Sequence, residues 1–410
     1  MPEFAILSEV AFRFVLPFGV FMIVSVHGSQ QLKSACHAAR YIFLTVGVST
    51  SSWAPMIPFA KTQLELDDAG LGLILLAMGA GGIVGMPLTA YFIHRFTSRT
   101  VVLVSGLLMC LTLPTLILAP TPLLLAVALF FFGIVVGMMD VATNAQAVVI
   151  EERMGRSLMS GFHGLFSIGG LIGSAGVSIL LALGVPVLVC SFTVAIAIAL
   201  LVLWQSKYLL QCAEEGDQGD HHFVWPRGAV LFIGSLCFIS FLAEGAMLDW
   251  SAVFLKFSRG YEEGIAGFGY SVFSVSMAAG RMSGDKLNGF FGPVRMLQLG
   301  GLVAGLGYLL AVILPWGAAG FVGFVMVGLG AANIVPVLFS IAGRLPNTPP
   351  RIALSSITTL GFSGLLLGPA LIGFVAEAST LPLALSGVAI LLFVVAASAR
   401  SVVSASTDEV

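Results

Sequence analysis

The chain has 410 residues, of which 58% are hydrophobic and only 9% are charged, and its formal net charge is -2. A composition this apolar excludes a water-soluble globule, and the absence of a basic cluster argues against nucleic acid as a partner. The five cysteines are odd in number and scattered, so neither a disulfide framework nor a metal site is predicted, and we expect no cofactor. The sequence predicts a multi-pass protein of the inner (cytoplasmic) membrane.

Apolar runs of membrane-spanning length recur along the chain with short polar breaks between them. Backbone amides in hydrocarbon need internal partners, so such runs become bundled helices. We expect a first set of spans and then, after a polar stretch rich in acids, a second set: 38–60, 70–95, 100–119, 122–149, 157–183 and 185–206, then 228–255, 264–287, 294–315, 318–343, 353–377 and 380–399. The predicted fold class is all-α, with about twelve transmembrane helices of roughly 20 residues in two six-helix halves.

These spans set the expected domain organisation. It consists of an N-terminal extension (1–37), a first half (38–208), a cytoplasmic linker (209–227), a second half (228–400) and a cytoplasmic tail (401–410). The extension contains a short apolar stretch preceded by acids, which makes a poor signal peptide. It is an interfacial helix, an extra span, or a segment upstream of the natural start.

Lysine and arginine residues are distributed unevenly about the spans. If the residues before the first span face the cytoplasm, most of these cations fall at the cytoplasmic side, and only Lys61, Lys256 and Arg259 fall on the other side. Cytoplasmic loops of membrane proteins are enriched in Lys and Arg. The asymmetry therefore supports both the direction and the even number of spans.

Several short motifs accompany the two-half pattern. They are Ser52-Trp53-Ala54, Arg95-Phe96 with Arg99, His163-Gly164, Ala243-Glu244-Gly245 with Asp249-Trp250, Gly280-Arg281 with Gly284, Gly328-Leu329-Gly330-Ala331 and Gly368-Pro369. On these residues, the stretch from about 38 to 400 resembles the major facilitator superfamily, and within it the bacterial YbjJ- and MosC-like branch. The resemblance implies a secondary transporter with two six-helix halves, whose relatives are loosely tied to sugar-like solutes.

Asp140 is the one charged residue within the apolar run from Gly133 to Val149. A charge at mid-bilayer costs about 2.5–3.5 kcal/mol, so such acids usually face a cavity or a partner. Asn144 follows one turn later on the same face. Asp140 could carry a proton, as a span-four acid does in the fucose-type symporters it resembles, or tie its helix to a neighbour. His163 could share that proton, or bond a backbone carbonyl or Asn144.

Glu244 and Asp249 lie five residues apart on the seventh span, so they project about 140° away from each other. Glu244 lies deeper, and we expect it to face the substrate cavity and to be a further candidate for proton coupling. Asp249 and Trp250 lie nearer the outer face. There, Trp250 either anchors the span at the interface or stacks on a sugar ring.

The remaining candidates are gating and hydrogen-bonding residues. Arg281 and Asp285 are four apart on the eighth span, which predicts a structural ion pair or an inner gate. Arg95 and Arg99, after span two, are expected to anchor that turn at the anionic leaflet. The other candidates for substrate binding are Trp53, Asn144, Asn333 and Thr359. The polar ones could equally bond neighbouring helices.

Two classes of function compete. The first is a secondary transporter that works by alternating access, with a small-molecule substrate, protons and the lipid bilayer as partners and a monomeric state. The second is a non-transporting sensor or scaffold. An enzyme is not predicted, because no HExxH motif, phosphate loop or nucleophile with its base is found.

Within transport, few buried cations argue against an anionic solute. We favour proton-coupled symport of a small polar solute, for which a sugar-like compound is one candidate. Efflux of an amphipathic or cationic compound by proton antiport is the alternative. The stretch Gly164–Gly176 weighs against it, since it lacks the glycine-proline motif that antiporters of the superfamily often show.

Overall fold

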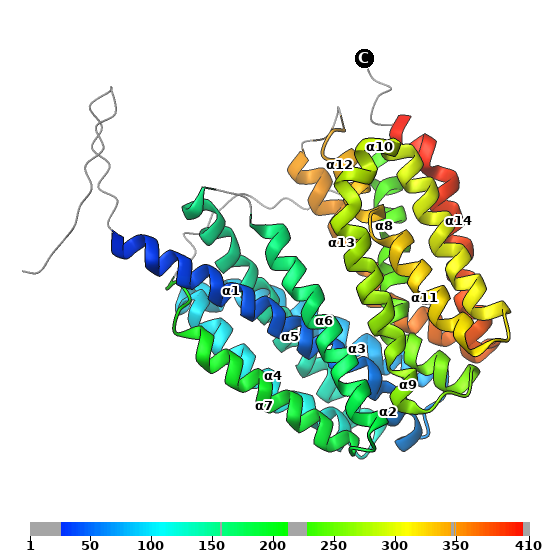
Figure 1. Cartoon of the computed structure of the whole chain (residues 1–410), viewed down its shortest axis with the longest axis horizontal. Coiled ribbons are helices and arrows are strands. Elements are labelled where there is room, and N and C mark those ends of the chain that lie inside the picture. The colour runs from blue at the N-terminus through cyan, green and yellow to red at the C-terminus, as the bar shows by residue number, and fades with distance from the viewer. Residues whose placement is uncertain (1–25, 156–157, 212–227, 346–347, 349, 405–410) are drawn as a thin grey trace, which may run out of the picture.

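A computed structural model describes residues 26–155, 158–211, 228–345, 348 and 350–404. Every regular element among these residues is helical, and the helices form two bundles side by side (Figure 1). Most of the expected extension (1–25), the acidic part of the expected linker (212–227) and the end of the expected tail (405–410) lie outside the described residues.

The first bundle is formed by the helices that precede residue 211. They are α1 (Val26–Ser52), η1 (Ala54–Met56), α2 (Ile57–Gln63), α3 (Asp68–Arg95), α4 (Ser98–Leu118), α5 (Pro122–Met154), α6 (Met159–Ala182) and α7 (Val187–Ser206). Helix α1 begins at Val26 rather than near residue 38, the expected start of the first span. It continues through η1 and α2 as one long span that bends near Pro55 and Pro58, since proline removes a backbone donor.

Short polar residues begin three of these helices. The side chains of Asp67, Thr97 and Thr121 each accept a hydrogen bond from the backbone N–H three residues later, at 2.6, 3.2 and 3.3 Å. Such N-caps satisfy donors that the first turn leaves unpaired. Gly155, with φ of 61°, ends α5 in a left-handed conformation that glycine adopts without steric cost.

The second bundle is formed by the helices after residue 227. They are α8 (Gly228–Val253), η2 (Phe254–Ser258), α9 (Glu263–Ala266), α10 (Phe268–Ile313), α11 (Gly317–Ala331), α12 (Ile334–Ala342), α13 (Pro350–Ala378) and α14 (Leu381–Ser404). Helix α10 runs through two expected spans and kinks at Gly292, where φ is 77° and Pro293 follows. Helices α11 and α12 form one span that breaks next to Asn333.

Eleven segments of the described chain are long and apolar enough to cross a membrane. The part of α10 before Gly292 is the twelfth crossing. It is less apolar, because it carries Arg281, Asp285 and Lys286 together with several Ser and Gly residues. The predicted all-α, polytopic fold is confirmed.

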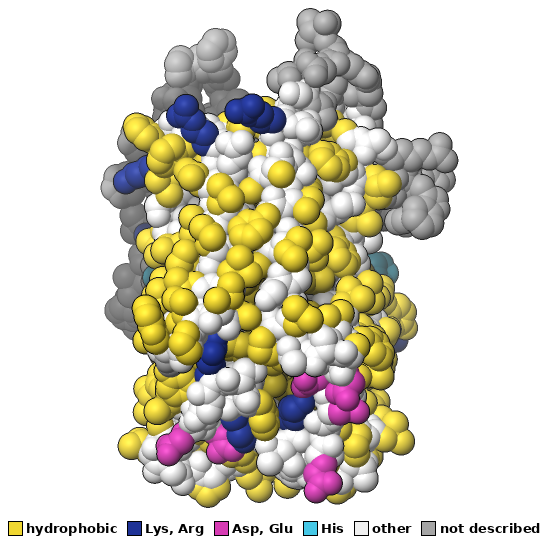
Figure 2. All heavy atoms as spheres, turned by 90° about the vertical axis from the view of Figure 1, so that its right-hand side faces the viewer, with side chains coloured by type: hydrophobic (Ala, Val, Ile, Leu, Met, Phe, Trp, Pro, Cys, Tyr) yellow, Lys and Arg dark blue, Asp and Glu magenta, His cyan; other side chains and the backbone are white. Residues whose placement is uncertain are grey.

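An apolar girdle surrounds the molecule between two polar ends. Figure 2 shows it on the flank of the second bundle, with Lys and Arg gathered at one end and acids near the other. We call these the basic end, marked by Arg95, Arg99, Lys207, Arg344 and Arg400, and the acidic end, marked by Asp67, Asp68, Glu262, Glu263 and Glu377. The girdle is the surface that lipid chains cover.

Helices within each bundle approach closely at glycines. A Cβ on Gly133 of α5 would lie 1.9 Å from the carbonyl oxygen of Met78 on α3, and one on Gly364 of α13 would lie 2.2 Å from that of Phe238 on α8. Small residues allow membrane helices to pack backbone against backbone. The pairs α3–α5 and α8–α13 are among the most extensive in the molecule.

Two helix pairs join the bundles, namely α3 with α13 and α6 with α10. In the first pair, Gly72 packs against the backbone at Pro369 and Ala370, and Gly79 packs against Leu366. These α3 residues belong to the half of the helix that starts at the acidic end. The bundles are therefore in close contact toward the acidic end.

Candidate functional site

The second bundle contains an ion pair between Glu244 on α8 and Arg281 on the first part of α10. Arg281 donates to Oε2 of Glu244 at 3.2 Å. The Glu244 side chain is 16% exposed and that of Arg281 is 43% exposed. The other carboxylate oxygen, Oε1, is buried without a hydrogen-bond partner. Leaving it unpaired costs free energy that a proton or a solute hydroxyl would recover.

This pair differs from the expected one between Arg281 and Asp285. Asp285 lies one turn later on α10, but its side chain is outside the described part of the structure. The position of α8 explains the difference, because it brings a buried carboxylate within reach of the guanidinium. Arg281 thus joins two helices of the bundle.

Two tyrosines that the sequence did not single out lie beside this pair. The Tyr308 hydroxyl, from the part of α10 after the kink, donates to the carbonyl of Ala243 at 2.7 Å. Tyr270 lies within electrostatic range of Glu244, Arg281 and Asp249. Only six tyrosines occur in the chain, so a tyrosine inside an apolar span was the signal available.

His163 lies on α6 of the first bundle and faces the same region. Its side chain is exposed, and its ring packs edge-on against Phe43 of α1 with centroids 5.3 Å apart. The charge of Arg281 acts on it across the space between the bundles. Candidates from both bundles, His163 and the Glu244–Arg281 pair, therefore share one electrostatic environment.

The bundles separate on the basic side of Ser174. Ser174 on α6 donates to the carbonyl of Gly267 at 3.3 Å and is bonded by Ser271 of α10 at 2.9 Å. Among described residues, the hydrogen bonds and close glycine contacts from α6 to the second bundle involve Ser174 or residues beyond it. A Cβ on Gly161 or Gly164 would meet nothing within 4 Å. About 22 Å of α6 precedes Ser174 at 1.5 Å per residue.

Asp140 on α5 has its partner on its own helix. The side-chain amide of Asn144 donates to Asp140 Oδ1 at 3.3 Å and to its backbone carbonyl at 2.9 Å. Helical spacing places Asp140 on the stripe of Gly133, which packs on α3. No hydrogen bond or ion pair joins Asp140 to His163 in the described chain, so the structure does not bring these two candidates together.

Trp53, Asp249 and Trp250 are packed inside the protein. The two tryptophans are 1% and 0% exposed, and both indole N–H groups are buried without a partner. Asp249 is buried as well. Trp250 therefore is not an exposed anchor at the membrane interface in this conformation.

The predicted hydrogen-bonding candidates divide into two groups. Asn333 donates to the carbonyl of Gly280 on α10 at 2.9 Å, so it holds the break between α11 and α12 against α10. Gln146 bonds Ser98 and the backbone of Leu210 within the first bundle. Thr359 is exposed on α13.

The basic-end arginines lie in different surroundings. Arg95 is exposed in the last turn of α3, and Arg99 is half-buried in the first turn of α4. Arg99 lines a surface cavity together with Lys207. Among described residues, no group of three or more His, Cys, Asp or Glu side chains could hold a metal ion.

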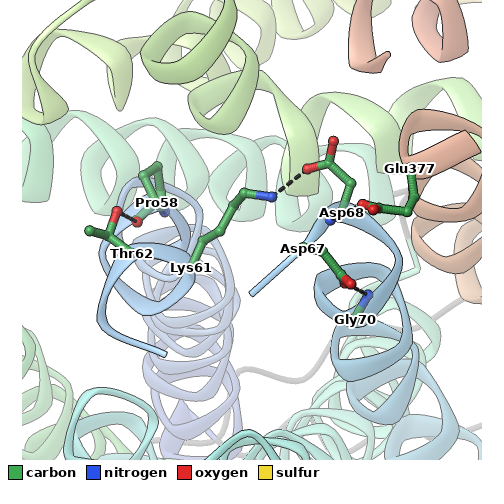
Figure 3. Close-up of polar contacts among 7 residues, drawn as sticks. All are labelled: Pro58, Lys61, Thr62, Asp67, Asp68, Gly70 and Glu377. Carbon is green, nitrogen blue, oxygen red and sulfur yellow. Dashed lines mark hydrogen bonds and ion pairs between the residues drawn. The ribbon is translucent and has the colours of Figure 1, made fainter. Parts of the chain in front are cut away.

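A polar cluster at the acidic end joins the bundles. Lys61 on α2 pairs with the carboxylate of Asp68 at the start of α3, beside Glu377 of α13 (Figure 3). The Asp68 backbone N–H donates to Glu377 Oε2 at 3.0 Å, and Lys256 of η2 donates to Thr62 at 3.2 Å. We call Lys61, Thr62, Asp68, Lys256 and Glu377 the acidic-end latch.

Comparison with known sequences identifies the family. The profile of the Major Facilitator Superfamily matches residues 41–369. An uncharacterized MFS-type transporter of Yersinia pestis is 46% identical over 374 residues, which cover 91% of this chain and 96% of that protein. Membrane protein MosC of Rhizobium meliloti is 32% identical over 354 residues, or 86% of each chain.

Solved structures show the same fold. The nucleoside transporter NupG aligns with a TM-score of 0.75 at 14% identity, covering 90% of this chain and 99% of that one. The xylose transporter XylE of E. coli, in a partially occluded inward open conformation, aligns with a TM-score of 0.68 at 14% identity, covering 91% and 98%. The profile match and the sequence relatives together show that this chain belongs to the Major Facilitator Superfamily of membrane transporters.

Proposed function

We propose that this transporter moves a small polar solute together with protons, and that the Glu244–Arg281 pair is the centre of both binding and coupling. One observation carries the proposal. The pair bridges α8 and α10 with a half-exposed guanidinium, while one carboxylate oxygen stays buried and unpaired. Intramembrane ionisable groups of this type mark substrate and proton pathways.

The conformation supports alternating access. The latch and the α3–α13 contacts close the acidic end, whereas α6 and α10 diverge on the basic side of Ser174. The positive-inside rule assigns the basic end to the cytoplasm. We therefore interpret the structure as an inward-open state in the inner membrane, and transport requires the latch to break while the basic ends close.

The ion pair provides a simple coupling device. Protonation of Glu244 removes the negative partner of Arg281 and frees the guanidinium for solute oxygens. Loss of that proton restores the pair and displaces the solute. A ligand can shift an equilibrium only through differential affinity, and the protonation state of Glu244 supplies that difference.

The balance of charge favours a neutral, hydroxyl-rich solute. Glu244 and Arg281 neutralise each other, so the site does not demand a charged ligand. Tyr270 and His163 add polar groups around the pair. The related folds include transporters of nucleosides and xylose, which are neutral and polyhydroxylated. We propose a solute of this class.

One feature favours the alternative of cationic efflux. Asp249 is a buried carboxylate beside Trp250 and close to Tyr270, and acids next to aromatic rings bind organic cations well. A solute screen separates the two proposals.

The screen measures thermal unfolding of the purified protein with pentoses, hexoses, nucleosides, amino sugars and cationic amphiphiles. We expect a neutral polyhydroxylated solute to raise Tm, because a ligand that binds only the folded state stabilises it. Arg281→Gln should lose this shift, while Arg344→Gln, which removes an exposed basic-end cation, should keep it. Stabilisation by cations alone would favour efflux, and a shift that survives in Arg281→Gln would remove the pair from the site.

A further inference from the structure

A second candidate site lies at the basic end of the first bundle, away from the Glu244–Arg281 pair. A cavity of about 660 Å³ opens where the start of α1, the start of α4 and the end of α7 meet. Arg99 and Lys207 line it, and Gln30, Ser34 and Tyr208 add amide and hydroxyl groups. No acidic side chain lines the cavity in the described chain. These groups suit an anion with several oxygen acceptors.

The two cations are held in place. Lys207 lies over the Tyr208 ring, with Nζ 5.0 Å from its centroid. Arg99 follows the N-cap Thr97 in the first turn of α4 and is half-buried. The N-terminus of that helix adds partial positive charge in the same direction. The cavity therefore presents a fixed positive surface.

The surface next to the cavity faces lipid. Tyr41 of α1 and Trp204 of α7 contact each other with centroids 6.1 Å apart and are 41% and 54% exposed. Tyr41 lies seven residues after Ser34, on the same face of α1 and about 10 Å further along it. Tyrosine and tryptophan at such positions mark the membrane–water interface. Exposed Leu200 and Leu203 continue the apolar surface.

We propose that this cavity binds the phosphate group of an anionic phospholipid from the leaflet at the basic end. Arg99 and Lys207 bind the phosphate, the amide and hydroxyl groups bind headgroup and ester oxygens, and the acyl chains cover the Tyr41–Trp204 pair. Free phosphate offers the same charge, but it leaves the aromatic surface unused. Basic pockets between transmembrane helices on the cytoplasmic side recognise lipid headgroups in this way.

The second bundle provides an internal comparison. A groove of about 510 Å³ lies at its own basic end between α10 and α14. It has one cation, Arg295, together with Gln298 and the rings of Phe291 and Phe393. With a single cation, this groove should prefer anionic lipid less than the first cavity does.

Quenching of Trp204 by brominated phospholipids tests the proposal in reconstituted protein. The Trp204→Phe variant gives the background from the other tryptophans. We expect brominated phosphatidylglycerol to quench Trp204 at a much lower mole fraction than brominated phosphatidylcholine does. Arg99→Gln with Lys207→Gln should weaken this preference by about 30-fold, because each cation near an anionic surface contributes a factor of about five.

The matched control is Arg344→Gln with Arg400→Gln, which removes two exposed cations from the basic end of the second bundle. It should keep the preference, whereas equal loss in both double variants would show a diffuse charge effect and overturn the site. Equal quenching by both lipids would also contradict the proposal. Inorganic phosphate at millimolar concentration should not displace the lipid, and full displacement would assign the cavity to free phosphate. Unfolding temperatures without added lipid check that each variant is folded.

Discussion

At the scale of single residues, buried polar atoms without partners distinguish this protein from a simple apolar bundle. They include Glu244 Oε1 and the indole nitrogens of Trp53 and Trp250. Buried polar groups are normally hydrogen-bonded, so such atoms call for an explanation. Glu244 is accounted for by proton and solute binding. The two tryptophans lie next to the cavity-facing elements η1 and α8, and the structure gives no further reason for their unpaired N–H groups.

The role of Asp140 is a separate prediction at this scale. Asp140→Asn removes the ionisable group, while the neighbouring Asn144 can still bond the new amide. We expect the variant to lose accumulation driven by a pH gradient in proteoliposomes but to retain counterflow of solute. Thr143→Val, which changes the hydroxyl beside it that bonds only its own helix, is the matched control and should accumulate solute. Normal accumulation by Asp140→Asn would leave Glu244 as the coupling carboxyl.

At the scale of helices, packing depends on glycine contacts that a methyl group would abolish. Gly133→Ala would place a Cβ 1.9 Å from the Met78 carbonyl oxygen, so α3 and α5 must move apart. Overpacking of this kind costs about 1–3 kcal/mol. We expect a clear drop in Tm of the purified protein, measured by thermal unfolding. Gly170→Ala is the control, since nothing lies within 4 Å of its Cβ position, and equal Tm values for the two variants would contradict the packing described here.

The latch gives a second prediction at the helix scale. Glu377→Ala with Thr62→Val removes both cross-bundle hydrogen bonds of the acidic end. Exposed polar contacts contribute about 0.2–1 kcal/mol each, so the population open at the acidic end should rise several-fold. Labelling of Ser174→Cys by a membrane-impermeant thiol reagent from that side, in a background without other cysteines, measures it, because Ser174 is buried at the bundle contact.

The control for the latch is Ser379→Ala, whose hydroxyl bonds only within α13. It should leave the labelling rate unchanged. If the double latch variant labels no faster than this control, the cluster does not hold the acidic end closed.

At the scale of the whole molecule, the apolar pattern predicts the elements well. Periodic apolar runs, polar breaks and caps such as Thr97 and Thr121 locate most spans to within a few residues. The first span was the main exception, since α1 extends back to Val26 through a polar stretch with Gln30 and Gln31. Its expected start at 38 followed hydropathy, whereas a helix continues wherever its backbone bonds are satisfied.

The partners of side chains were harder to predict, because they depend on how helices rotate about their axes. Spacing along one helix suggested Arg281 with Asp285, yet the packing of α8 on α10 gave Arg281 a partner in Glu244. The same limit applies to Tyr308, which reaches Ala243 from beyond the Gly292 kink. Only Asp140 with Asn144, a pair on one helix, could be inferred from spacing.

The central claim is that the carboxyl of Glu244 couples solute to protons through Arg281. The most direct measurement is transport by Glu244→Gln in proteoliposomes, using a solute identified by the thermal screen. We predict that accumulation under an imposed pH gradient disappears while solute counterflow persists, because the uncharged amide mimics the protonated acid. Accumulation at the wild-type level would contradict the account.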